Sequence, residues 1–201
     1  MNLPNKISIT RICMIPVFVL AFFLDGILPF NYAIAAVIFA IAACTDFIDG
    51  YIARSRGLVT NLGKFLDPIA DKVLVATAMI VILTMQDSLF AMLGEMQTAI
   101  YIGTAISISV ILARELIISA FRQIAAANGV VMAADKLGKY KTTFQDASIF
   151  VLILAADIPD TAGVVVAWIG FALFAVATIL TVWSGISYVV KNKQVLQDKK
   201  D

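Results

Sequence analysis

Apolar residues form long stretches along the chain, and short polar turns such as Asp25-Gly26 and Asp157-Ile158-Pro159-Asp160 separate them. Most of these stretches approach or exceed the roughly 20 apolar residues that a helix needs to cross a bilayer. The fifth stretch is shorter, so its polar N-terminal extension from Lys139 is expected to be helical as well. The pattern predicts six membrane-spanning helices, near residues 8–28, 32–53, 69–86, 96–121, 143–157 and 162–190.

The overall composition agrees with a membrane protein. Hydrophobic residues make up 61% of the 201 residues and charged residues only 14%, whereas about a quarter of a soluble domain is charged. The length leaves no room for a sizeable domain outside the membrane, so we expect one all-α integral membrane domain over residues 1–201. A net charge of +1 argues against nucleic acid as a partner. Cys13 and Cys44 lie in apolar stretches without a metal-binding pattern, and we expect them to be small buried side chains.

The basic residues all fall on one side of this predicted topology. The fifteen Lys and Arg residues lie at the two termini, between the second and third stretches, and around the connection from the fourth to the fifth. The three opposite connections carry acidic charges alone, at Asp25, Asp87, Glu95, Asp157 and Asp160. By the positive-inside rule, both termini and both basic connections face the cytoplasm. This predicts a multi-pass protein of the cytoplasmic (inner) membrane.

Four aspartates lie on or beside the second and third predicted helices. Asp46 and Asp49 are three residues apart and Asp67 and Asp71 are four apart, so each pair shares one helix face. A carboxylate at the centre of a membrane helix costs about 2.5–3.5 kcal/mol on insertion scales, so this cluster needs compensating cations. The chain has no histidine, and ligation by oxygen alone favours Mg²⁺ or Mn²⁺. The pattern predicts a site for two divalent cations, an arrangement suited to phosphoryl transfer.

An alternative is a salt-bridge network between these aspartates and the neighbouring cations Arg54, Arg56, Lys64 and Lys72. Surface pairing does not require the small residues Gly50, Ala53 and Gly63 that alternate with the acids. Close approach of a phosphate or a flat base to the backbone does require them. Arg54, one turn beyond Gly50, could then clamp a phosphate oxygen. The small residues therefore favour a binding site.

The spacing of these residues resembles the signature of the CDP-alcohol phosphotransferase family, at Asp46, Asp49, Gly50, Ala53, Arg54, Gly63, Asp67 and Asp71. The resemblance implies a six-helix membrane enzyme, with two Mg²⁺ or Mn²⁺ ions as cofactors, that moves a substituted phosphoryl group from a CDP-linked donor to an alcohol and releases CMP. It implies that all four aspartates ligate metal and that Asp71 is also the catalytic base. It further implies a homodimer, and a CDP-binding role for Gly50, Ala53, Arg54 and Gly63.

A second basic cluster, around the connection from the fourth to the fifth stretch, bears on the acceptor. Arg114 and Arg122 are eight residues apart, two turns along one helix face, and Lys136, Lys139 and Lys141 follow. An acceptor phosphate would use such cations, whereas a neutral alcohol would not need them. Alternatively, the lysines obey the positive-inside rule or contact anionic lipid head groups. Arg114 fits that alternative less well because it lies within an apolar run.

Three segments resemble the phosphatidylglycerophosphate synthase branch of the same family, at residues 2–11, 113–119 and 138–145. This resemblance implies CDP-diacylglycerol and sn-glycerol 3-phosphate as substrates, and phosphatidylglycerol phosphate and CMP as products. The alternatives within this chemistry are a phosphatidylinositol phosphate synthase and a cardiolipin synthase. A divalent-cation transporter is an alternative from another class of membrane protein. It would spread its acidic residues through the depth of the membrane and show inverted repeats. The sequence instead places the acids at one level and shows no repeat.

Overall fold

The computed structural model describes residues 3–56, 61–127 and 136–192, and these fold into helices joined by short turns. Between α3 and α4 the chain forms a π-helical turn, η1 (Gln86–Phe90), and a 3₁₀ helix, η2 (Ala91–Met96). The six α-helices are α1 (Leu3–Phe23), α2 (Asn31–Arg56), α3 (Asn61–Ile82), α4 (Gln97–Ala127), α5 (Lys136–Ala155) and α6 (Asp160–Lys191).

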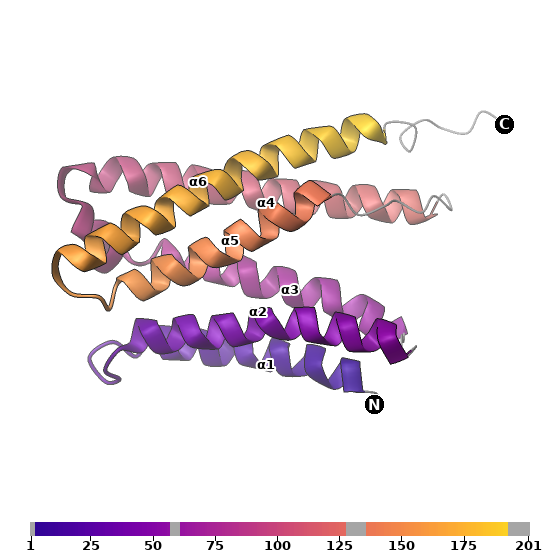
Figure 1. Cartoon of the computed structure of the whole chain (residues 1–201), viewed down its shortest axis with the longest axis horizontal. Helices are drawn as coiled ribbons and strands as arrows, with labels where there is room; N and C mark the ends of the chain where they lie inside the picture. Colours follow the sequence, from indigo (N-terminus) through magenta and orange to yellow (C-terminus); the bar gives the residue numbers. More distant parts are fainter. Residues whose placement is uncertain (1–2, 57–60, 128–135, 193–201) are drawn as a thin grey trace.

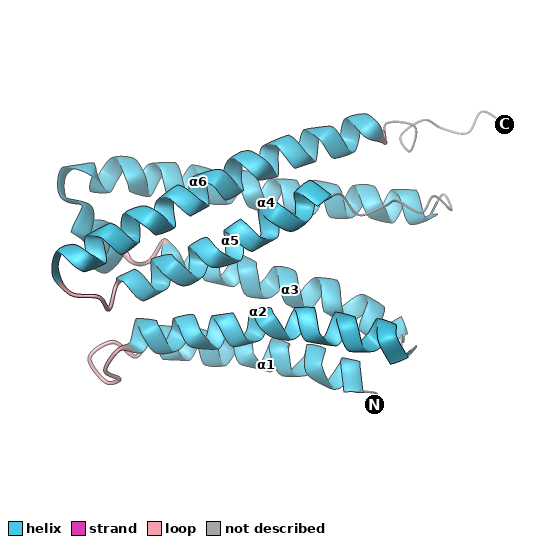
Figure 2. Cartoon of the chain, in the orientation of Figure 1, coloured by secondary structure: helices cyan, strands magenta, loops and turns pink. Residues whose placement is uncertain are grey.

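The helices run along the long axis of the molecule in two groups, α1 to α3 and α4 to α6 (Figure 1). The start of α1, the end of α2, the start of α3, the end of α4, the start of α5 and the end of α6 all lie at one end, which we call the basic end. The turns carrying Asp25 and Asp157 lie at the other end, the acidic end, together with the short helices η1 and η2, which carry Asp87 and Glu95, and the start of α6 at Asp160 (Figure 2). The ends of the helices that flank the two basic connections therefore lie at the same end of the bundle, as the predicted topology requires.

All six predicted helices are present, although their boundaries differ. The third begins at Asn61 rather than near residue 69, so Asp67 and Asp71 lie within α3. The first ends at Phe23 rather than near residue 28, because the turn residues begin immediately afterwards. The fifth does include the polar segment from Lys139, and it begins at Lys136. The two short helices η1 and η2 were not predicted.

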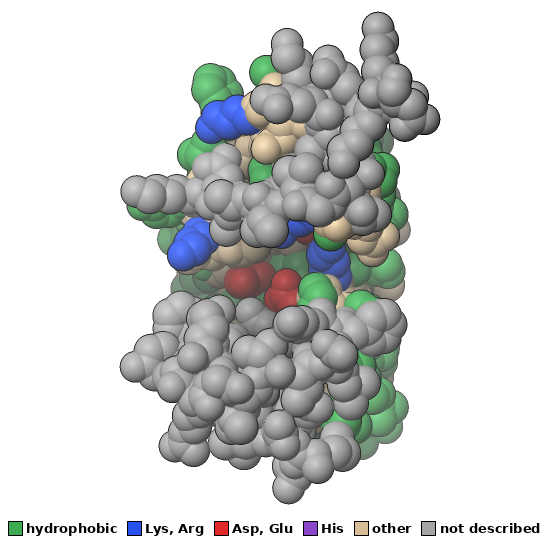
Figure 3. Space-filling model, turned by 90° about the vertical axis from the view of Figure 1, so that its right-hand side faces the viewer, with side chains coloured by type: hydrophobic (Ala, Val, Ile, Leu, Met, Phe, Trp, Pro, Cys, Tyr) green, Lys and Arg blue, Asp and Glu red, His purple; other side chains and the backbone are tan. Residues whose placement is uncertain are grey.

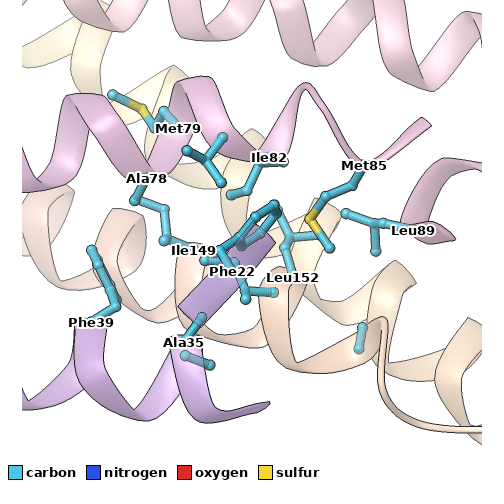
Figure 4. Close-up of a cluster of buried hydrophobic side chains, with 14 of the residues drawn as sticks. Phe22, Ala35, Phe39, Ala78, Met79, Ile82, Met85, Leu89, Ile149 and Leu152 are labelled. Atoms are coloured by element: carbon cyan, nitrogen blue, oxygen red, sulfur yellow. The ribbon is translucent and has the colours of Figure 1, made fainter. Parts of the chain in front are cut away.

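The core of the bundle lies between the two groups of helices. Phe39 of α2, Met79 of α3 and Leu152 of α5 are all almost completely buried and come together in one cluster (Figure 4). α5 packs extensively along α6, and α1 along α2, while α2 also contacts α5 and so joins the groups. Close van der Waals packing of this kind holds helices together where lipid removes the hydrophobic driving force.

The outer surface is strongly apolar. Leu20, Leu116 and Trp183 expose 64%, 72% and 68% of their area, far more than large apolar side chains in a soluble core. Within the described residues, the segments Gln86–Ala126 and Asp160–Lys191 are long and apolar enough to cross a membrane. Cys13 and Cys44 are exposed on this surface, so the expectation that they are buried was wrong. An apolar exterior accepts such small side chains as readily as a core does.

The turns at the acidic end are tied together by two side-chain hydrogen bonds. The backbone N–H of Ala33, near the start of α2, donates to Oδ2 of Asp157 in the α5–α6 turn over 2.6 Å. Nδ2 of the buried Asn31 donates to the carbonyl oxygen of Phe22 over 2.7 Å. Because the first N–H groups of a helix have no partner within it, Asp157 caps α2 from a distant part of the sequence.

Candidate active site

A cavity of about 350 Å³ lies between α3, α4 and α5. Figure 3 looks onto the basic end and shows acidic and basic side chains together in a hollow of this face. The cavity wall combines charged side chains with apolar ones, so it suits a ligand that has both characters. The lining residues are Asp71, Lys72, Val73, Val75, Ala76 and Met79 of α3, Leu112, Glu115 and Leu116 of α4, and Lys141, Thr142, Gln145 and Asp146 of α5.

Asp71 belongs to this wall, and its side chain is partly exposed. Asp46 and Asp49 lie in the last part of α2, and Asp67 and Asp71 lie in the first half of α3. Both segments are helical, so the spacing within each pair places its members on one helix face. Because α2 ends and α3 begins at the basic end, the two pairs lie at the same end of the bundle (Figure 1).

Most of the predicted donor and metal site lies outside the described side chains. This applies to Asp46, Asp49, Gly50, Ala53, Arg54, Gly63 and Asp67. Among the side chains that are described, no group of three acidic, histidine or cysteine residues lies together. The metal-binding roles of the four aspartates therefore stay predictions, as do the CDP-binding roles of the residues between them.

Lys141 is the predicted acceptor-site residue that the structure places in the cavity wall. Its side chain is only 3% exposed, and its Nζ donates to Oε1 of Glu115 over 2.6 Å. Arg114 Nη1 donates to the same oxygen over 3.0 Å. One carboxylate on α4 therefore pairs with two cations, one on its own helix and one on α5.

The guanidinium of Arg114 also contacts α6. Its Nη2 donates to Oγ of Ser184 on α6 over 3.0 Å, and its side chain does not line the cavity between α3, α4 and α5. Instead, Arg114 lines a separate apolar groove between α4 and α6, beside Gly185. Its described contacts with the acceptor site therefore pass through Glu115.

Among the described side chains, Arg122 and Lys139 do not line this cavity. Arg122 Nε donates to the hydroxyl of Tyr188 over 3.1 Å, and the guanidinium lies 5.2 Å from the centre of that ring. Lys139 is exposed, while the side chain of Lys136 lies outside the described residues. The phosphate-binding roles of these three residues stay predictions.

A second polar link joins α3 to α4. Lys72 Nζ donates to Oγ of Ser119, and that hydroxyl donates to the backbone carbonyl of Glu115 over 2.5 Å. The sequence suggested Lys72 only as a possible partner of the aspartates and assigned no role to Ser119 or Glu115. A signal for Glu115 was present, because an acid directly beside a base within an apolar helix needs a partner.

Arg11 is a further residue whose placement the sequence did not reveal. It is completely buried, and its Nε donates over 3.2 Å both to the carbonyl oxygen of Ala42 and to Oγ1 of Thr45. These contacts join α1 to α2 immediately before Asp46. Arg11 thus fixes the position of the helix segment that carries the first aspartate pair.

Comparisons with known proteins identify the family of this chain. Residues 1–183 match the family model of CDP-alcohol phosphatidyltransferases. Curated relatives named CDP-diacylglycerol–glycerol-3-phosphate 3-phosphatidyltransferase include one from Bacillus subtilis (strain 168), 36% identical over 98% of this chain and 97% of its own length. The protein of that name from Rickettsia bellii is 36% identical over 93% of this chain and 93% of its own length. The one from Salmonella typhimurium is 37% identical over 98% of this chain and 98% of its own length. The family match spans most of the chain, including both aspartate pairs and the cavity residues, and the chain therefore belongs to the CDP-alcohol phosphatidyltransferase family.

Proposed function

We propose that the protein transfers the phosphatidyl group of CDP-diacylglycerol to sn-glycerol 3-phosphate, giving phosphatidylglycerol phosphate and CMP. The names of relatives at 36–37% identity over almost the whole chain support this reaction. The structural observation that carries the proposal is that Asp71 and Lys141 line one cavity. To react, a phosphorylated alcohol requires two groups in the site. One is a carboxylate that accepts the proton of its hydroxyl, and the other is a cation that binds its phosphate.

We also infer that all six α-helices span the membrane, with both termini and the cavity on the cytoplasmic side. The α-helices have 20 to 32 residues, or about 30 to 48 Å at 1.5 Å per residue, enough for a hydrocarbon core of about 30 Å. The apolar outer surface and the collection of basic residues at one end support this orientation. The acyl chains of the donor can then stay in lipid while its diphosphate reaches the cytoplasmic boundary.

The residues of the aspartate signature fit two Mg²⁺ or Mn²⁺ ions. Asp46, Asp49, Asp67 and Asp71 offer only carboxylate oxygens, and the sequence contains no histidine to favour a softer metal. Bound cations would neutralise the donor diphosphate and make its phosphorus more electrophilic. The small residues Gly50, Ala53 and Gly63, with Arg54, are proposed to hold the CDP portion beside them.

The chain's own groups account for the other steps of the reaction. Asp71 accepts the proton of the glycerol 1-hydroxyl, whose oxygen forms a bond to the phosphatidyl phosphorus as the bond from that phosphorus to the CMP oxygen breaks. Lys141 holds the acceptor phosphate and so keeps the hydroxyl directed toward Asp71. Most of the rate enhancement then comes from positioning and from fixed charges.

The alternative acceptors leave the same donor chemistry intact. A phosphatidylinositol phosphate synthase would use an inositol phosphate, and a cardiolipin synthase would use phosphatidylglycerol. A divalent-cation transporter is disfavoured because the helix segments carrying both aspartate pairs lie at one end of the bundle. A homodimer, implied by the family resemblance, also stays a prediction.

The deciding experiment supplies purified protein with CDP-diacylglycerol, Mg²⁺ or Mn²⁺ and one acceptor at a time, and measures CMP release. We expect release with sn-glycerol 3-phosphate and much less with glycerol, inositol phosphate or phosphatidylglycerol. Equal use of glycerol and sn-glycerol 3-phosphate would contradict the phosphate-binding role of the cavity. Absence of release with every acceptor would contradict the proposed reaction.

A further inference from the structure

A continuous series of polar contacts connects α6 to the acceptor side of the cavity. It runs from Ser184 of α6 to Arg114 and Glu115 of α4, and then to Lys141 of α5, with donor–acceptor distances of 3.0, 3.0 and 2.6 Å. The contacts of Arg114 and Lys141 both end on Oε1 of Glu115. Glu115 is therefore the shared partner in this series.

The Arg114 side chain is held in the direction of α6. A Cβ added to Gly185 would lie only 3.0 Å from Arg114 Cγ and 3.4 Å from its Nε, so the absence of a side chain at Gly185 gives the arginine room. Nε itself is buried and has no hydrogen-bond partner among the described residues. These contacts leave Arg114 packed between α4 and α6, rather than directed into the cavity that holds Asp71.

Lys141, in contrast, lines the cavity, and its ammonium contacts Glu115, which lines the same cavity. An ammonium has three donor hydrogens, and the contact with Glu115 uses one of them, so an arriving phosphate can share the remaining donor capacity. A lysine side chain has considerable rotamer freedom, and one short charged contact at its tip restricts that freedom. Holding a binding group in place before the ligand arrives lowers the cost of binding.

We propose that Glu115 is the positioning residue for the acceptor phosphate, and that Arg114 acts through Glu115 rather than by touching the phosphate. This inference rests on the proposed function, because it concerns the acceptor of that reaction. It differs from what the sequence pattern suggests for Arg114, namely direct contact with the phosphate itself. Arg114 and Ser184 hold the carboxylate from the α6 side, and the carboxylate holds the Lys141 ammonium at the cavity.

A double-mutant cycle separates the two roles of Arg114. The variants Glu115→Gln, Arg114→Gln and their combination are assayed by CMP release, with KM measured for sn-glycerol 3-phosphate and for CDP-diacylglycerol. We expect each single change to raise the acceptor KM by about tenfold or more while the donor KM stays within about threefold. The double variant should be no worse than Glu115→Gln alone, because groups that act through one another do not add.

Direct binding of phosphate by Arg114 predicts a different result. The losses in the two single variants would then multiply in the double variant, by about a hundredfold if each costs tenfold, and that outcome would overturn the inference. An unchanged acceptor KM in Glu115→Gln would also overturn it. If the wild type itself releases no CMP with sn-glycerol 3-phosphate, the proposed function fails, so the two failures are distinguishable.

Three further variants distinguish a positioning role from a merely structural one. Glu95→Gln makes the same chemical change at an exposed position of η2 at the acidic end, and both KM values should stay at the wild-type level. Glu115→Asp keeps the negative charge, so it should recover part of the acceptor affinity that Glu115→Gln loses. If Glu115→Gln fails to fold, Gly185→Ala still tests the series, since crowding Arg114 should raise the acceptor KM alone. An equal rise in the donor KM would contradict the positioning role.

Discussion

The two ends of the helix bundle use the same kinds of side chain for different purposes. At the acidic end, Asp157 caps the start of α2, and Asn31 ties α1 to α2 through a buried hydrogen bond to the backbone carbonyl of Phe22. At the basic end, Glu115 and Lys141 instead contact each other across helices, beside a cavity. A carboxylate that satisfies backbone N–H groups contributes to stability, whereas one that pairs with cations around a cavity is placed for binding.

The backbone differs between the ends as well. The turns at the acidic end are short and contain left-handed conformations at Phe30 (φ 57°) and Asp160 (φ 60°). A Cβ at Gly163, in the first turn of α6, would overlap the carbonyl oxygen of Ile158. Such tightly closed turns hold pairs of neighbouring helices at a fixed distance. We therefore assign a stabilising role to the acidic end and propose that the chemistry takes place at the basic end.

The largest effect is expected at the predicted metal site. Asp67→Asn should abolish CMP release while the protein stays folded, because one charge among the metal ligands is lost. Thorough chelation with EDTA should likewise abolish CMP release by the wild type, and addition of Mg²⁺ or Mn²⁺ should restore it. The matched control is Asp87→Asn in η1 at the acidic end, which should keep its activity. A tenfold loss of rate corresponds to a barrier about 1.4 kcal/mol higher. If Asp67→Asn loses less than this, metal ligation by Asp67 is contradicted.

The next effect separates chemistry from binding at Asp71. General bases contribute typically 10²- to 10⁴-fold to a rate, so Asp71→Asn should lose turnover by about that factor. Binding of CDP-diacylglycerol in the presence of metal should persist, because three of the four predicted ligands, Asp46, Asp49 and Asp67, would remain. Turnover by CMP release and equilibrium binding of the donor measure the two properties. An equal loss in both would make Asp71 chiefly a ligand.

Much of the fold could be predicted from the sequence because the bilayer imposes strong constraints. Each spanning helix needs a long apolar stretch, and basic residues collect on one side, so the number of helices and the grouping of their ends could be inferred. The η1 and η2 helices could not, because they depend on packing that local sequence does not encode. Leu89 and Phe90 of η1 are completely buried, and the Phe90 ring contacts Tyr101 and Phe171 on two other helices.

The candidate site was only partly accessible to the same reasoning. Lys141 was predicted as an acceptor-site cation and does line the cavity with Asp71. Its partner Glu115 lies 26 residues away in the sequence, and no local pattern indicates that pair. The direction of Arg114 is likewise set by Ser184 and Gly185, about seventy residues further along. Contacts between helices distant in sequence determine which of several basic residues reaches the cavity.

A smaller effect, confined to one substrate, is expected at Lys141. Lys141→Met keeps much of the side-chain volume but removes the charge, so the acceptor KM should rise about thirtyfold, equivalent to about 2 kcal/mol. The KM for CDP-diacylglycerol should hardly change. The matched control is Lys191→Met, in the last turn of α6 at the basic end. It should leave the KM values for acceptor and donor unchanged. Parallel increases for donor and acceptor would show that Lys141 supports the whole site rather than the acceptor.

The smallest effect on activity is expected at the acidic end. Asp157→Ala removes the acceptor for the Ala33 N–H and leaves that donor without its cap, at a cost of about 0.5–2 kcal/mol. The midpoint of thermal unfolding in detergent should fall by several degrees, since about 1 kcal/mol corresponds to about 2–4 °C in a chain of this size. Both KM values and the turnover at low temperature should match the wild type, because α2 carries its aspartates at the opposite end. Asp25→Ala, which changes an exposed acid at the same end, should leave the unfolding midpoint nearly constant. A loss of turnover in Asp157→Ala without a lower midpoint would show that the acidic end takes part in the chemistry, and the division between the two ends would then fail.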